Sequence, residues 1–469
     1  MSIHTERHAH RGGAGLIDGL RAALRGDVID PTHAEYDAAR SVWNGLIDRR
    51  PAVIARCADA ADVAEAVRLA RTFRPPVSIR GGGHQVAGSA VCHDGLVIDM
   101  SAMRGVEVDA DRRVAIVQGG ARWGDVDTAT QGVGLAVPGG EVSTTGVAGF
   151  TLGGGMALTS RKFGLACDNL RSVEVVTADG EVRHADRDQH ADLFWAARGA
   201  GRGIGVVTSF AFDLNPLGPE VAAATVFYPY GEAGRILRVW RDLAPSMPET
   251  VTPQLILWSV PPDPAIPEAL HGEKCVIVTG VYAGPADEAD AALAPLRRLV
   301  PPLHDMTGTV SYVDQQSSVD DLFPDGNRYF MKALGFDGLD DAAIDSLLAW
   351  DARRPTPDSL IALRTLGGAV ARVGPTQSAF PHRGDRFNLS IDAGWSDPGQ
   401  DASAIGWARG MWDELRPYSN GGVYVNFAGL DDDAGAAREH LFRDSAARLA
   451  DVLASYDPEG VFAAAAQRP

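Results

Sequence analysis

A chain of 469 residues with 45% hydrophobic residues is too long for one hydrophobic core, so we expect two or three globular domains. Its net charge of -18 and the lack of a Lys/Arg run argue against a nucleic-acid partner, because a phosphate backbone binds basic surfaces. The four cysteines have no paired spacing, which predicts buried thiols and neither disulfides nor a metal site. No signal-peptide pattern and no uncharged apolar run of ~18–20 residues is present, so we expect a cytoplasmic protein without a membrane partner.

The first third of the chain alternates between short strands and helices. Asp59 stands in front of an amphipathic stretch and is a suitable helix N-cap. The patterns predict strands at 53–55, 77–80, 96–100, 106–108 and 114–117, and helices at 16–24, 61–70 and from Trp123 to about Gly132. This part should therefore form a compact α+β unit.

A glycine loop follows the strand at 77–80. Gly81, Gly82 and Gly83 precede His84, and three residues without Cβ allow backbone N–H groups to approach an anion. The loop predicts a phosphate-binding site, and a tight surface turn is the alternative for this loop taken alone.

Two further stretches are rich in glycine. Each interior glycine costs about 0.5–1 kcal/mol relative to alanine, so the dense glycines over 139–155 predict close approach of backbone to a large, flat or phosphorylated ligand. The cluster at 199–205 contains Gly-x-Gly, but a helix at 191–197 precedes it and a strand at 206–212 follows. This order is the reverse of a dinucleotide-binding motif, so NAD binding is not supported.

Together these motifs resemble the flavin domain of the berberine bridge enzyme-like FAD-linked oxidoreductases. The likeness extends over about 36–215, resumes at 422–427 and 456–458, and is especially strong to the bacterial branch that contains 6-hydroxy-D-nicotine oxidase. The motifs that carry it are Arg80-Gly-Gly-Gly-His84, Pro138-Gly-Gly140, Thr145-Gly-Val-Ala-Gly149, Leu152-Gly-Gly-Gly155, Cys167-Asp-Asn169 and Gly205-Val-Val-Thr208.

The resemblance implies an α+β fold of the vanillyl-alcohol-oxidase or PCMH type. We expect an N-terminal tail with a short helix over 1–35, and an FAD-binding domain of two α+β subdomains over 36–215. A substrate domain follows over 216–415, and the segment 416–469 returns to the FAD domain. Strands at 255–258, 275–278, 360–364 and 387–393 with helices at 231–243 and 286–299 predict that the substrate domain is an antiparallel sheet covered by helices.

In that family the histidine at the position of His84 is bonded to the 8α-methyl carbon of FAD. Some members add a cysteine where this chain has Val142, and Cys167 lies too far along to replace it, so the resemblance implies one covalent bond. Relatives also close an Asn-rich tail over the cofactor, whereas this chain ends in an alanine-rich stretch. By resemblance the FAD-binding residues are Arg80, Gly81, Gly82, Gly83, His84, Gln85, Gly88, Ser89, Pro138, Gly139, Gly140, Val142, Thr144, Thr145, Gly146, Gly149, Gly153, Gly154, Asn169, Gly205, Val206, Val207 and Asn426.

Catalysis in this family removes hydride from a C–H bond next to oxygen or nitrogen. An alcohol needs a base to take its hydroxyl proton, whereas a neutral amine releases hydride directly. Many relatives carry a tyrosine base where this chain has Phe427. The candidate catalytic residues are Tyr424, Asn426, Asp392 and Tyr312, and for Tyr424 and Asn426 strand hydrogen bonding and packing are equally open.

We therefore expect an FAD-dependent oxidase of a small organic molecule, an amine or an otherwise activated substrate, with O₂ as the electron acceptor. Its setting would be secondary metabolism or catabolism. A flavin-linked alcohol or sugar dehydrogenase stays open, as does a flavoprotein that sequesters or cyclises a small molecule without net oxidation. No metal is implied, and the substrate, its stereochemistry and the oligomeric state are not determined by the sequence.

Overall fold

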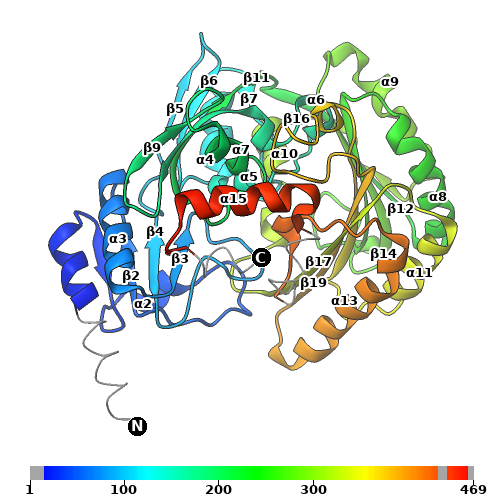
Figure 1. Ribbon diagram of the computed structural model, residues 1–469. Helices are drawn as coiled ribbons and strands as arrows, with labels where there is room; N and C mark the ends of the chain where they lie inside the picture. The colour runs from blue at the N-terminus through cyan, green and yellow to red at the C-terminus, as the bar shows by residue number, and fades with distance from the viewer. Residues whose placement is uncertain (1–14, 431–440, 463–469) are drawn as a thin grey trace.

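A computed structural model describes residues 15–430 and 441–462. Within these ranges the chain builds two small sheets in its N-terminal half and one large sheet in its C-terminal half (Figure 1). The alanine-rich tail after Phe462 lies outside the described residues. The α+β class expected from the sequence is confirmed.

The first sheet has the strand order β1-β2-β4-β3 and is covered by one long helix, α3. Asp59 caps α3, since its side chain accepts hydrogen bonds from the backbone N–H groups of Ala61 and Asp62. The bounds are β1 (Asp27–Ile29), β2 (Val53–Arg56), α3 (Ala60–Phe73), β3 (Val77–Arg80) and β4 (Leu96–Asp99), with a helix at 15–23 and the short α2 (Tyr36–Arg40) before β2. Strand β1 was expected to lie in an N-terminal tail, but it pairs antiparallel with β2.

The second sheet is antiparallel, in the order β5-β6-β10-β8-β9. Its strands are β5 (Val106–Asp109), β6 (Val114–Gln118), β8 (Leu170–Val176), β9 (Val182–Ala185) and β10 (Val206–Asp213). Helices α4 (Trp123–Gln131), α5 (Val147–Leu152), α6 (Ser160–Phe163) and α7 (Ala191–Ala197) belong to the same half, and β7 (Leu135–Ala136) pairs with β11 (Asn215–Pro216). The glycine-rich connections run between these two sheets and therefore come close to one another.

The large sheet is antiparallel and has the order β15-β12-β14-β13-β18-β19-β17, with β16 beside β12. Strand β19, between β18 and β17, is buried along its whole length, and its alternate side chains face opposite ways. Leu389 and Ile391 join the core under the helices, whereas Asp392 points to the other face. The bounds are β12 (Glu220–Pro229), β13 (Val251–Ser259), β14 (Lys274–Tyr282), β15 (His304–Asp305), β16 (Gly308–Ser311), β17 (Arg328–Phe336), β18 (Leu360–Thr365) and β19 (Phe387–Trp395).

Helices cover the outer face of the large sheet, as expected, and leave its other face toward the N-terminal half (Figure 1). They are α8 (Ala233–Leu243), α9 (Ala289–Leu293), α11 (Asp341–Asp351) and α13 (Asp401–Leu415), while the short α10 (Tyr312–Ser317) and α12 (Ala369–Arg372) lie in connections. The single helix expected over 286–299 is wrong. Pro285 precedes this segment and Pro295 interrupts it, so α9 keeps five residues between two 3₁₀ turns.

The C-terminal segment packs back on the N-terminal half, where α15 (Ala446–Tyr456) contacts α7 (Figure 1). Strand hydrogen bonding was one alternative for Tyr424 and Asn426, but neither residue lies in a strand, because residues Val425–Phe427 form a 3₁₀ turn. The domain boundaries at 36, 216 and 416 stay predictions. No helix in the described part of the chain has the length and apolarity needed to span a bilayer.

Candidate functional site

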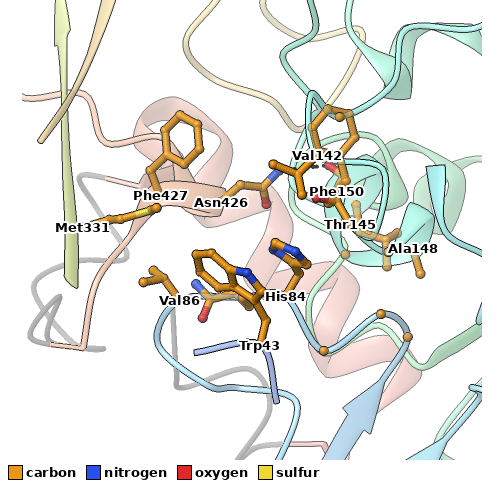
Figure 2. Close-up of a pocket in the computed structure, with 18 of the residues that line it drawn as sticks. Trp43, His84, Val86, Val142, Thr145, Ala148, Phe150, Met331, Asn426 and Phe427 are labelled. Carbon is orange, nitrogen blue, oxygen red and sulfur yellow. Dashed lines mark hydrogen bonds between the residues drawn. The ribbon is translucent and has the colours of Figure 1, made fainter. Parts of the chain in front are cut away.

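A cavity of about 320 Å³ runs from the two N-terminal sheets to the inner face of the large sheet. Ile79 and Val207 line it where the first and second sheets meet, and Gln254, Arg364 and Asp392 line it on the large sheet. Figure 2 shows Phe427 and Met331 on one side and Thr145 and Ala148 on the other. An elongated cavity of this kind suits an extended ligand with chemically different ends.

Backbone forms the middle of the wall. The glycine loop 81–83 touches the segment 144–146 so closely that a Cβ on Gly82 would lie 2.5 Å from the Cα of Gly146. Gly83 has a φ of 69°, which a side chain would strain. At Gly149, by contrast, a Cβ would meet no atom within 4 Å, so its backbone is open. Some of the glycines thus allow two protein segments to contact each other. The glycine content of the sequence had predicted only a close approach of backbone to a ligand.

His84 projects from this loop into the cavity, and two neighbours fix its ring. The indole of Trp43 stacks on the imidazole with ring centroids 4.4 Å apart and an interplanar angle of 18° (Figure 2). The Nε2 atom of His84 lies 3.1 Å from Oγ1 of Thr144. Burial, with a smaller effect of the Arg122 charge, lowers the pKa of His84 to about 3. The imidazole is therefore neutral at physiological pH and keeps a lone pair on one ring nitrogen.

A chain of polar side chains crosses the end of the cavity at the large sheet. Nε2 of Gln254 donates to Oε1 of Glu141 over 2.7 Å, and Nε of Arg364 lies 3.9 Å from the same carboxylate oxygen. Nη1 of Arg364 also donates to Oγ of Ser390 over 2.9 Å. Ser390 in turn donates to Oδ2 of Asp392 over 2.9 Å. Glu141 and Asp392 thus share one cation.

Asp392 is the terminal group of this chain and is only 7% exposed. Its Oδ1 atom is buried and has no hydrogen-bond partner among the residues that the structure describes, and Asp392 as a residue lines the cavity. Burial raises the pKa of Asp392 to about 6, against the opposing effects of Arg364 and Ser390. Asp392 can therefore take up and release a proton near neutral pH.

Because residues 425–427 form a turn, only one of the two C-terminal catalytic candidates, Asn426 and not Tyr424, lines the cavity. Asn426 and Phe427 line it, and the guanidinium of Arg364 lies 4.7 Å from the centre of the Phe427 ring. Tyr424 is buried behind them and accepts hydrogen bonds from the backbone N–H groups of Gly155 and Met156 and from Nδ2 of Asn426. Burial raises the pKa of Tyr424 to about 12. The contacts of Tyr424 are those of a structural group.

The structure brings together fifteen of the residues suggested by the sequence and leaves the others behind the wall. On the cavity are Gly81, Gly82, Gly83, His84, Gln85, Ser89, Gly140, Val142, Thr145, Gly146, Gly149, Gly205, Val207, Asp392 and Asn426. Outside the lining set are Arg80, Gly88, Pro138, Gly139, Thr144, Gly153, Gly154, Asn169, Val206, Tyr312 and Tyr424. Of the second group, Thr144 still acts on the site through His84.

Several residues of the second group have clear structural contacts. Nδ2 of Asn169 donates to the carbonyl groups of Phe163 and Leu165, which closes the turn before β8. Gly154 lies under the ring of Phe380, where a Cβ would come within 2.6 Å. Tyr312 is buried in a separate apolar cluster, and burial raises its pKa well above the usual value. Tyr312 is therefore not positioned as a base for this cavity.

Sequence reasoning missed a second set of lining residues, chiefly Trp43, Glu141, Arg202, Gln254, Ile256, Trp258, Met331 and Arg364. Most lie on strands of the large sheet, where the alternation of side chains does not reveal which face meets the cavity. Glu141 directly follows the Pro138-Gly-Gly motif, so the sequence could have predicted that it lies near the cavity. All four cysteines are free and buried, as expected.

The cavity fits a flavin dinucleotide. Open backbone at Gly149, a neutral histidine at the glycine loop and an acceptor at Asp392 match an elongated cofactor with an anionic middle and a redox ring. The described residues hold no cluster of three or more His, Cys, Asp and Glu side chains able to bind a metal ion. Fold and cavity together define a flavin-dependent oxidoreductase.

Comparison with known proteins identifies the family. The FAD binding domain family matches residues 51–186. The FAD-linked oxidoreductase YgaK of Bacillus subtilis is 30% identical over 452 residues, which cover 94% of this chain and 96% of that protein. The (R)-6-hydroxynicotine oxidase of Paenarthrobacter nicotinovorans is 32% identical over 292 residues, 62% of each chain. The solved structure of Physcomitrella patens BBE-like 1 superposes with a TM-score of 0.85 at 22% identity, over 95% of this chain and 97% of that one.

The chain therefore belongs to the FAD-linked oxidoreductases, and the expected PCMH-type fold, which is that of the berberine bridge enzyme-like structure, is confirmed.

Proposed function

We propose that this protein is an oxidase that binds FAD along the cavity, bonds it once through His84 and removes hydride from a C–H group next to nitrogen or oxygen. Residues 36–215 would hold FAD, residues 216–415 the substrate, and O₂ would be the electron acceptor. When bound, FAD supplies the hydride acceptor. The observation that carries this proposal is the pairing, in one cavity, of a neutral histidine on the glycine loop with a buried carboxylate, Asp392, that has one oxygen without a hydrogen-bond partner.

The surroundings of His84 support covalent attachment. A neutral imidazole is a nucleophile, and the contact with Thr144 occupies Nε2, so Nδ1 is the nitrogen that we assign to the bond. Val142 lines the cavity at the position where some relatives have a second attaching cysteine (Figure 2). The thiol of Cys167 cannot serve instead, because it is outside the lining set and burial raises its pKa to about 12.

Asp392 is the group to which we assign proton transfer. Its free Oδ1 atom accepts a hydrogen bond from the N–H or O–H of the substrate, and the carboxylate takes that proton as the substrate loses hydride. Arg364 and Ser390 hold the other side of the carboxylate in place. Phe427, at the position of the tyrosine base in many relatives, adds an apolar surface and no proton acceptor.

The walls around Asp392 favour an amine with an apolar body. Ile256, Trp258, Met331, Leu360 and Ala362 cover the inner face of the large sheet around the polar chain. A sugar presents hydroxyl groups in several directions and needs matching polar partners, which these side chains do not offer. The second candidate, a flavin-linked dehydrogenase of an apolar alcohol, is supported by Asp392 itself, because an alcohol requires a base.

Anaerobic reduction of the bound flavin tests the proposal. We expect the flavin absorbance of the purified protein to bleach with cyclic secondary amines faster than with matched alcohols, and hardly at all with disaccharides. On admission of O₂, H₂O₂ should form in proportion to product. Bleaching without H₂O₂ would favour the dehydrogenase, and tight binding without bleaching would contradict oxidation and favour a sequestering flavoprotein.

We also propose a cytoplasmic location. All four cysteine thiols are free and buried, which is typical of a reducing compartment.

A further inference from the structure

His84 is the innermost of three stacked rings. The Trp43 indole covers the imidazole at 4.4 Å, and the phenol ring of Tyr329 covers the outer face of the same indole at 3.9 Å and 9°. Trp43 comes from the segment before β2, and Tyr329 from β17 of the large sheet. Trp43 is 6% exposed and Tyr329 is 4% exposed, so the stack is buried on both sides.

The indole is held in its plane by a hydrogen bond. Nε1 of Trp43 donates to the carbonyl of Phe323 over 2.9 Å, and the hydroxyl of Tyr329 donates to the carbonyl of Pro324 over 2.9 Å. Both acceptors belong to the connection before β17. The side chain of Phe323 also lines the cavity. The orientation of the ring above His84 is thus set by residues of the large-sheet half.

Residues 43–45, here called the bridging segment, join the two halves through their backbone. The N–H of Trp43 donates to the carbonyl of Gly83 over 3.2 Å, and its carbonyl accepts from the N–H of Gly326 over 2.9 Å. The N–H of Gly45 donates to the carbonyl of Asn327 over 2.7 Å. A Cβ at Gly45 would lie 2.0 Å from the carbonyl oxygen of Gly326, so only glycine fits there.

Asn44, which is fully buried, completes the bridging segment. Its Nδ2 atom donates to the carbonyl groups of Val86 over 2.6 Å and Tyr329 over 2.8 Å, and its Oδ1 accepts from the N–H of Tyr329 over 2.9 Å. One amide side chain therefore fixes the residue two positions after His84 against the residue that ends the ring stack. Such a contact sets a fixed distance between the glycine loop and β17.

From this geometry we propose that Trp43 is a positioning residue for covalent attachment: it holds the His84 imidazole at the angle required for the bond to FAD, and Tyr329 supports it from the substrate half. This inference rests on the proposed covalent flavin. Formation of the bond removes one hydrogen from the 8α-methyl carbon and one from the imidazole N–H. The two electrons released pass into the flavin ring and then to O₂, which leaves as H₂O₂ with the two protons.

The test compares three variants by the share of flavin that stays with acid-precipitated protein, relative to flavin released into the supernatant. In Trp43→Leu, which removes the aromatic face but keeps an apolar side chain, this share should fall about tenfold, because misplaced reacting atoms lose orientation. Trp43→Phe should restore most of it. Trp350→Leu is the matched control, since this indole, on helix α11, packs against Arg353 outside the cavity lining, and its covalent share should equal that of the wild type.

A Trp43→Leu protein with the wild-type covalent share would overturn the inference. If that variant cannot be purified folded, Tyr329→Leu decides, because it removes only the outer ring: a lowered covalent share supports the stack and an unchanged share refutes it. His84→Ala should show no acid-stable flavin. Wild-type protein without acid-stable flavin would instead refute the proposed covalent bond itself, and this inference with it.

Discussion

Burial moves the pKa values of His84 and Asp392 in opposite directions, and both shifts suit the chemistry assigned to them. An imidazole loses its charged form on burial, and a carboxyl group loses its charged form as well, so the histidine pKa falls and the aspartate pKa rises. The result is a neutral nucleophile at the glycine loop and a proton acceptor that titrates near pH 6 at the large sheet.

This pKa of Asp392 predicts the pH dependence of kcat/KM. In the proposed reaction the Asp392 carboxylate takes the substrate proton, so kcat/KM should fall about tenfold per pH unit below a limb near pH 6. Asp392→Asn should lose that limb and reduce the plateau about 100-fold or more. Ser390→Ala is a matched control: its hydrogen bond lowers the pKa, so removing it should move the limb to higher pH. An unchanged limb in Asp392→Asn would show that another group accepts the proton.

At the level of single residues, the sequence predicted the glycine-loop side of the site better than the other side. His84, Gly149 and Val142 belong to short local motifs, in which neighbouring residues in the sequence determine the backbone conformation. Tyr424 and Tyr312 lie outside the cavity lining, because the place of Tyr424 depends on a 3₁₀ turn and that of Tyr312 on a distant apolar cluster. Trp43 could not be foreseen, since its ring stack involves β17, far away in sequence.

Among the structural elements, the connection between β18 and β19 is anchored by a buried ion pair. Nη1 and Nη2 of Arg383 each lie 2.6 Å from an oxygen of Asp168, in the turn before β8, and both side chains are nearly fully buried. Nη2 also donates to Oγ of Ser378. Arg383 therefore joins the two halves of the molecule.

Removing one partner of this pair should cost more than removing both. Arg383→Met leaves the Asp168 carboxylate buried without its main partner, which should lower the free energy of unfolding by about 3–5 kcal/mol. The double variant Arg383→Met, Asp168→Asn should be less destabilised than the single one, because the carboxylate left without Arg383 is then replaced by a neutral amide. Urea denaturation followed by tryptophan fluorescence measures both. Equal stability of Arg383→Met and wild type would contradict the importance of the pair.

Element prediction succeeded where the local pattern and the tertiary environment agreed. Helix α7 and strand β18 have the expected positions, since their apolar periodicity matches what they pack against. The segment 286–299 failed because proline spacing overrides its helical periodicity, and β1 was missed because three residues gain strand geometry only by pairing with β2.

For the molecule as a whole, the cofactor cavity connects all three sheets, so bound FAD should contribute to overall stability. Wild-type protein that carries a covalent cofactor cannot lose it, and its melting temperature should not depend on added FAD. In His84→Ala the cofactor binds reversibly, so the melting temperature should rise with FAD concentration, by about 1.4 kcal/mol of stability per tenfold increase above the Kd. Differential scanning fluorimetry over a series of FAD concentrations makes this comparison. A wild-type melting temperature that rises equally with FAD would contradict covalent attachment.

The fold class followed from the resemblance of several glycine motifs to one family, and the comparisons confirmed it. The lining residues on the inner face of the large sheet could not be predicted, because side chains that line a binding cavity from strands carry no local sequence signature. Gln254, Trp258 and Arg364 form one surface because β13 pairs with β18, a pairing that the local sequence does not reveal.

The central claim is a single bond between FAD and His84, and peptide mass spectrometry tests it most directly. Trypsin should release residues 81–104 as one peptide, which contains His84, Cys92 and His93. We expect this peptide to carry the mass of one FAD or of its flavin fragment, and fragmentation should locate the modification at His84. An unmodified 81–104 peptide from yellow protein, or a flavin located on His93 or Cys92, would contradict the account.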